Sequence, residues 1–226
     1  MKGKGNLIQI LGIALILLSG ALLLGSRTLA RHRSTQAKAL AQQIEAQLPS
    51  RRAGTPEDYS DPAMPVWQLQ GEDFLGLVEV PSFGVTLPIH SLWEDSKLSS
   101  YPCRYWGSIY DGTLILGGSS EAGQFDFCEK LDLGERIIVT DMQGTQFSCG
   151  VERIDRADAL DYEALSEGNY PLTLFARTGT GNYIVIRCVF NVKITKWATD
   201  APSVAHLFCR FYWMINPFSV AFSVKP

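Results

Sequence analysis

Apolar residues follow one another almost without a break from residue 7 to residue 25, with Gln9 and Ser19 as the polar members. At about 1.5 Å per residue, a helix of this length nearly matches a hydrocarbon core of about 30 Å. A cleaved signal peptide is the alternative, because the chain starts with basic residues and residues 28–30 form a passable cleavage site. The apolar region of a signal peptide runs to about 15 residues, so this longer run favours an uncleaved transmembrane anchor.

The basic residues around this run bear on its orientation in a membrane. They are Lys2 and Lys4 before it and Arg27, Arg31, Arg33 and Lys38 after it. Because basic residues are retained on the cytoplasmic side, their count slightly favours a cytoplasmic location for the rest of the chain.

The spacing of apolar residues becomes helical between residues 34 and 48, and Pro49 ends the pattern. The apolar positions are Ala37, Leu40, Ala41, Ile44 and Leu48. This pattern predicts a short stalk helix. Residues 51–65 are rich in Gly, Pro, Asp and Ser, which is typical of a linker, so the folded domain is expected to begin near Val66.

Beyond the linker, short apolar runs with a period of two predict strands. The predicted strands are residues 74–80, 85–89, 113–116, 136–140, 145–154, 172–175 and 183–190. Residues 141–144 join two of them as a hairpin, with Gly144 where a positive φ is expected. Many short strands with brief connections favour a mainly β domain closed into a small barrel or sandwich over a parallel sheet covered by helices.

Two of these strands, at residues 172–178 and 183–188, are joined by a loop of Gly, Thr and Asn. Alternation along the first strand separates two faces, with Leu172, Leu174 and Ala176 on one and Thr173, Phe175 and Arg177 on the other. Strand ends beside such loops often display functional groups. The first strand therefore displays Arg177 at its end.

Composition narrows the possible functions. A chain of 226 residues, 46% of them hydrophobic, can form one buried core and a membrane segment. A formal net charge of -3 without a long basic run argues against a nucleic-acid partner. The five cysteines show no C-x-x-C spacing, so neither a metal site nor a redox motif is indicated, and no cofactor is expected. At most two disulfides can form, and their pairing stays open.

Residues 191–226 form an atypical tail in which large aromatic residues cluster at 207–215. Arg210 and Pro217 interrupt this short apolar run. The interruption favours an interfacial segment or a poorly folded extension over a second membrane span.

Three segments, in this order, resemble the sortases, the membrane-anchored cysteine transpeptidases of Gram-positive bacteria. Residues 74–89 are similar to the opening strands of the family, residues 102–108 to a segment common in clostridial-type (class B/D-like) sortases, and residues 131–144 to the family's Thr-Asp hairpin. The resemblance covers about residues 71–188. It implies a closed β-barrel with short helices, preceded by an N-terminal transmembrane helix.

In the sortases, a cysteine attacks a sorting signal of the LPxTG type, a histidine acts as acid and base, and an arginine steadies the substrate. All three positions differ in this chain. The histidine position falls on Ser119, the cysteine position on Arg177, and the arginine position on Asn182 or Tyr183, depending on where a one-residue loop deletion is placed. Serine cannot shuttle a proton near neutral pH, and arginine is permanently protonated and is not a nucleophile. The pattern therefore predicts a pseudoenzyme with no assigned catalytic residue, which retains a groove for a peptide or a partner.

Two alternatives stay open. An active transpeptidase with relocated groups requires His90 to lie within hydrogen-bond distance of a cysteine such as Cys103 or Cys188. We expect these cysteines, in a loop and on the last strand, to be inert packing residues and His90 to be a surface residue near Glu94 and Asp95. The second alternative, suggested by the aromatic tail, is the product of a decayed gene.

Arg177 also has two interpretations. Its guanidinium can bind a carboxylate or a phosphate in bidentate fashion. Alternatively, it is satisfied inside the protein by Glu121, Asp126 or a nearby carbonyl, and this second interpretation is slightly favoured.

The resemblance completes the predicted organisation. Residues 1–33 would form a cytoplasmic N-terminus and anchor, 34–65 a stalk helix and linker, 66–190 the barrel, and 191–226 the tail. In the sortases the barrel lies outside the membrane, contrary to the slight charge bias, and we follow the family. The implied partners are the lipid bilayer and an LPxTG-like sorting-signal peptide or a cell-surface protein.

Overall fold

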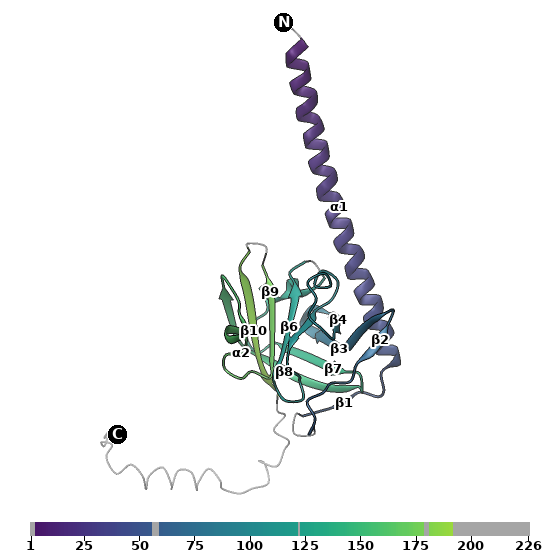
Figure 1. Cartoon of the computed structure of the whole chain (residues 1–226), viewed down its shortest axis with the longest axis vertical. Helices are drawn as coiled ribbons and strands as arrows, with labels where there is room; N and C mark the ends of the chain where they lie inside the picture. Colours follow the sequence, from purple (N-terminus) through teal and green to yellow (C-terminus); the bar gives the residue numbers. More distant parts are fainter. Residues whose placement is uncertain (1–2, 56–58, 122, 179–180, 192–226) are drawn as a thin grey trace, which may run out of the picture. The chain divides into compact units, whose positions relative to one another are not determined.

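The computed structural model describes residues 3–55, 59–121, 123–178 and 181–191 (Figure 1). The predicted tail, except Asn191, and the loop residues 179–180 lie outside these ranges. The described strands are β1 (Arg52–Ala53), β2 (Trp67–Leu69), β3 (Glu72–Val80), β4 (Val85–His90), β5 (Cys103–Trp106), β6 (Leu114–Ser119), β7 (Arg136–Asp141), β8 (Thr145–Ala157), β9 (Leu172–Arg177) and β10 (Tyr183–Phe190). The helices are α1 (Gly3–Gln47), α2 (Tyr162–Ser166) and the 3-10 turns η2 (Pro81–Phe83) and η3 (Phe125–Lys130).

Helix α1 joins the predicted anchor and the predicted stalk helix into one continuous helix of 45 residues. Its last turns bury Leu40, Ala41 and Ile44 against Phe74 and Leu77 on the outside of the sheet. The apolar spacing of residues 37–48 thus reflects a helix that is packed on the sheet. Within the described ranges, no helix is both long enough and apolar enough to cross a membrane.

The sheet closes on itself. Strands β8, β10, β9, β6, β5, β4 and β3 pair in that order, and β7 pairs with both β3 and β8. These eight strands therefore form a closed barrel in the described part of the chain, and the protein is mainly β with few short helices. Closure leaves the ring without free edges. Strands β4 and β5 have the shortest pairing in the described ring, since a single residue pair, His90 with Cys103, joins them.

The barrel interior contains the apolar residues that alternation assigned to one face. Leu172, Leu174 and Ala176 of β9 lie in the central core, together with alternate residues of the neighbouring strands. The hairpin between β7 and β8 also forms as predicted, because the Gly144 amide donates to the Asp141 carbonyl at 3.1 Å and Gly144 has a φ of 77°. Asp141 reinforces this turn by accepting from the Gln143 and Thr145 amides, both at 2.8 Å.

All seven predicted strands are present, but the short strands β1, β2 and β5 were not predicted. Strand β1 lies inside the predicted linker and pairs with β8. In the same segment, the Tyr59 ring stacks on Tyr110 with centroids 3.8 Å apart, and Met64 is buried. The expectation that residues 51–65 form only a linker is therefore wrong. The polar composition of this segment gave no sign of a strand, because backbone hydrogen bonds hold β1 and any residue except proline can make them.

Candidate functional site

The outward surface of strands β6, β9 and β10 carries the predicted site residues, and we call it the outer face. Its central residues Ile115, Phe175 and Val185 form an apolar cluster separate from the barrel core. Thr173, Phe175 and Arg177 follow one another on the outward side of β9, since the residues between them point into the core. The predicted division of β9 into two faces is therefore confirmed.

Three of the four predicted site positions meet at one end of this face. Ser119 at the end of β6 pairs with Arg177 at the end of β9 in parallel register. Tyr183 at the start of β10 pairs with the same Arg177 in antiparallel register. Paired residues on neighbouring strands project from the same face with Cβ atoms about 5 Å apart. The three side chains thus start from adjacent positions.

Asn182, the fourth position, belongs to the turn between β9 and β10. Its carbonyl accepts hydrogen bonds from the Thr178 amide at 2.7 Å and the Thr178 hydroxyl at 3.0 Å. The Gly181 amide donates to the Thr178 carbonyl at 3.0 Å. Asn182 therefore contributes its backbone to closing the turn.

Arg177 is exposed, and within the described residues its guanidinium has no hydrogen bond or ion pair. The carboxylates proposed to satisfy it have other partners. Glu121 lies 3.8 Å from Arg33 of α1, and Asp126 lies 3.7 Å from Lys130. The expectation that Arg177 is paired with Glu121 or Asp126 is wrong, because each carboxylate lies beside another basic residue, Arg33 or Lys130.

An aromatic layer covers the middle of the outer face. Trp93 stacks on Phe175 with ring centroids 5.6 Å apart, and Tyr105 meets Phe175 edge-on at the same distance. Gly117 of β6 makes room for this layer, because a Cβ atom there would lie 2.4 Å from Trp93 and 2.6 Å from Phe175. The middle of the face is therefore filled by the protein's own side chains, and its two ends remain accessible.

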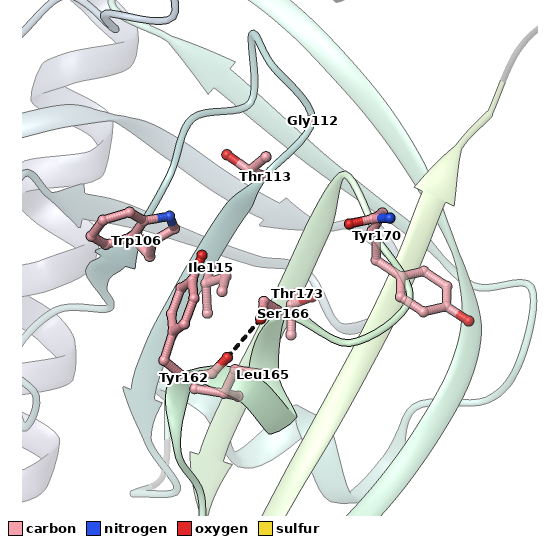
Figure 2. A pocket seen from close by; sticks show the side chains of 10 residues that line it. Trp106, Gly112, Thr113, Ile115, Tyr162, Leu165, Ser166, Tyr170 and Thr173 are labelled. Atoms are coloured by element: carbon pink, nitrogen blue, oxygen red, sulfur yellow. Dashed lines mark hydrogen bonds between the residues drawn. The ribbon is translucent and has the colours of Figure 1, made fainter.

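A pocket opens at the end of the outer face away from Arg177 and has a volume of about 80 Å³. Figure 2 shows Trp106 and Tyr162 close together at its wall and Tyr170 on the opposite side. The Trp106 and Tyr162 rings meet at 70° with centroids 5.2 Å apart. Hydroxyl groups of Thr113, Ser166 and Thr173 add polar lining. We call this the aromatic pocket, and its mixed lining suits one amphipathic or apolar side chain.

The aromatic pocket was not predicted from the sequence. Trp106 lies in a segment noted only for its family resemblance, and Tyr162 lies in a short helix of five residues. The two residues are far apart in the chain. The sequence shows that both are aromatic, but no pattern in it indicates that they meet.

Buried Arg187 positions the helix that forms one wall of this pocket. Its Nε donates to Asp155 at 2.9 Å, and its two Nη atoms donate to the carbonyls of Ala164 (2.7 Å), Leu165 (3.3 Å) and Glu167 (2.8 Å). These carbonyls at the C-terminal end of α2 lack helical partners, so a cation there is favourable. Arg187 therefore ties α2 and its Tyr162 to the barrel.

His90 is not a surface residue, contrary to expectation. It is the last residue of β4 and only 5% exposed. Its Nε2 lies 3.3 Å from Glu72, its Nδ1 lies 2.8 Å from the Leu92 carbonyl, and its ring meets Phe74 edge-on. Lys97 also donates to Glu72, which lowers the pKa of that carboxyl group. The partners of the His90 ring are therefore Glu72 of β3 and the Leu92 carbonyl, and not the side chains of Glu94 or Asp95.

The described cysteines are packing residues. Cys103, Cys128, Cys149 and Cys188 are buried and free of disulfides, whereas Cys209 lies outside the described residues. Burial raises the pKa of the Cys103 thiol to about 11 and that of Cys149 to about 12, and it raises the pKa of Cys128 and Cys188 as well. Neutral thiols are poor nucleophiles.

A relocated catalytic pair is not formed in the described structure. Cys103 lies at the start of β5, not in a loop, and pairs in register with His90. Its thiol donates to the carbonyls of Tyr101 at 3.6 Å and Glu94 at 3.9 Å, and no hydrogen bond joins it to the imidazole. Across the described ranges, no group of His, Cys, Asp and Glu side chains is arranged to hold a metal ion.

No protein-family model and no curated protein matches this chain. Solved structures similar to it include sortase C-1 from Actinomyces oris, with 18% identity over 70% of this chain and 98% of that chain and a TM-score of 0.47. Sortase A from Corynebacterium diphtheriae has 18% identity over 71% and 83% of the two chains and a TM-score of 0.47. The pilus-related sortase C of Group B Streptococcus has 15% identity over 71% and 90%, with a TM-score of 0.44. At such low identities and TM-scores, these similarities carry no conclusion about activity or ligand.

Replacing Arg187 with methionine is expected to lower the free energy of unfolding by about 3 kcal/mol, because Asp155 and three carbonyls lose a buried donor. Urea denaturation monitored by circular dichroism measures this loss. Arg153→Met is the matched control, since exposed Arg153 pairs with the same Asp155 and should change stability little. Equal destabilisation by both variants would contradict the positioning role of Arg187.

Alkylation should distinguish buried thiols from a catalytic one. We expect iodoacetamide at pH 8 to leave Cys103 and Cys149 of the folded chain unmodified, and to label both in urea. Because a raised pKa keeps a thiol neutral until the pH approaches that pKa, labelling of Cys103 should increase only toward about pH 11. Peptide mass spectrometry measures labelling at each site. Fast reaction of a single cysteine at pH 7 would support the alternative of an active transpeptidase with a relocated nucleophile.

Proposed function

We propose that this chain is a sortase-family protein that lacks cysteine transpeptidase activity and binds a peptide or a cell-surface protein on its outer face. The observation that carries the proposal is the register of β6 and β9. It sets Ser119 beside Arg177 at the strand ends, the two positions where the resemblance implies a histidine and a cysteine. This register supports the proposal, because it brings together the two residues at these positions and neither can perform the reaction.

The chemistry of these residues argues against transpeptidation. Covalent catalysis of this kind needs a thiolate and a group that accepts and returns a proton near neutral pH. Arg177 is a permanent cation, and the Ser119 hydroxyl already accepts a hydrogen bond from the Glu121 amide at 3.2 Å. The described cysteines are buried. We therefore propose that the protein binds its partner without cleaving a bond in it.

The outer face has features that suit peptide binding. Trp106 and Tyr162 are 55% and 46% exposed, and aromatic side chains of this kind dominate binding energy at protein interfaces. The aromatic pocket that they line accepts one side chain of a ligand. An LPxTG-like sorting-signal peptide or an exposed segment of a cell-surface protein is the proposed partner.

We expect no covalent adduct when the full chain is incubated with an LPxTG-type peptide and the intact mass is measured. The peptide should still bind, with a Kd raised several-fold by Tyr162→Ala, because the pocket loses its wall. Tyr59→Phe, which lies away from the pocket, is the control. The double variant Ser119→His, Arg177→Cys tests whether the frame can regain adduct formation. A thioester adduct with the natural chain would refute the pseudoenzyme proposal.

We further propose that α1 anchors the protein in a membrane as a single-pass span, with the barrel outside the cell. Leu and Ile side chains between residues 11 and 22 are 57–70% exposed in the described structure, and a lipid environment would cover them. The resemblance to sortases supports the orientation. In intact cells, added protease should therefore degrade the barrel, whereas protection until lysis would overturn the proposed topology.

A further inference from the structure

We propose that Arg177 makes the accessible end of the outer face a carboxylate-binding site, so that the bound peptide presents a carboxylate there. This inference rests on the proposed peptide-binding function and specifies its ligand. Arg177 would then have a binding role at the position where the resemblance implies a cysteine.

The guanidinium of Arg177 is available to a ligand. Arg177 is exposed at the last position of β9, and in the described part of the chain it donates no hydrogen bond to another residue. One of its Nη atoms lies beside Gly181, 4.0 Å from where a Cβ atom would be, so this neighbour offers no side-chain acceptor. The nearby carboxylates of Glu121 and Asp126 are paired with Arg33 and Lys130.

The neighbours of Arg177 add hydrogen-bond donors. The Ser119 hydroxyl accepts from the Glu121 amide, which leaves its own proton free to donate. The Tyr183 phenol also makes no hydrogen bond to another described residue. Both residues pair in register with Arg177 and project from the same face. A guanidinium flanked by two hydroxyl donors matches a group that only accepts.

A carboxylate fits this set better than a phosphate. Arginine binds a carboxylate through two parallel N–H···O bonds, and one guanidinium balances its single charge. Phosphate recognition uses clusters of arginines, whereas the two residues that pair with Arg177, Ser119 and Tyr183, add hydroxyl groups and no second cation. The charge of the site therefore favours a monoanion.

The distance between the two ends of the face sets the ligand's spacing. Thr173 lines the aromatic pocket, and Arg177 lies four residues further along the same side of β9. At about 3.3 Å per residue, this separation is roughly 13 Å. An extended peptide that runs parallel to β9, over the layer of Trp93 and Phe175, would span it with about four residues. We therefore expect an apolar side chain about four residues from the carboxylate.

The test uses the full chain in detergent micelles and isothermal titration calorimetry. Three versions of one peptide carry an apolar residue at the same place: a free C-terminal carboxylate four residues later, a C-terminal amide, and the amide with an Asp side chain at that position. The acid should bind about three- to tenfold more tightly than the amide. Recovery by the Asp peptide would show that a side-chain carboxylate also serves, and its failure would assign the site to a free C-terminus.

Variants assign this difference to Arg177. Arg177→Gln should abolish the preference for the acid while leaving the melting temperature unchanged, because the side chain is exposed. Arg136→Gln is the matched control, since it removes one exposed arginine from β7, outside the outer face, and should keep the preference. Equal binding of acid and amide by the natural chain would overturn the carboxylate site and leave peptide binding intact. Binding of none of the peptides would contradict the proposed function itself.

Discussion

The parallel pairing of β6 with β9 is the constraint on which the site depends. Its register runs from Leu114 opposite Leu172 to Ser119 opposite Arg177, between strands that are far apart in the chain. A slip of one residue would turn the side chains of a strand to the opposite face, moving Arg177 toward the core. Burial of the inward residues of both strands prevents such a slip, so core packing determines which groups the outer face displays.

Closure of the barrel makes this register rigid. Strand β7 pairs with β3 on one side and β8 on the other, which joins the ends of the sheet. The hairpin held by Asp141 then connects two strands of a continuous ring. None of these interactions involves Ser119 or Arg177. The register of the barrel therefore does not depend on the side chains of these two residues.

The outer face combines a filled centre with two accessible ends. Trp93 reaches the centre because Gly117 has no side chain, and it packs there against Phe175. The aromatic pocket and the Arg177 end remain on either side. This arrangement favours an extended ligand that touches both ends over a small molecule held at one point. Arg187 contributes from the back of the pocket by holding α2 in place.

Local periodicity by itself determined the helix, the seven longer strands, the two faces of β9 and the hairpin at residues 141–144. These features depend on neighbours within a few residues, so alternation and turn chemistry reveal them. The tertiary structure alone decided the strands β1, β2 and β5, the burial of His90, the free guanidinium of Arg177, and the meeting of Trp106 with Tyr162. Strand β2 is too short to show a period of two, although it pairs locally with β3. The other features depend on how segments distant in the chain come together, and such contacts leave no periodic pattern in either segment.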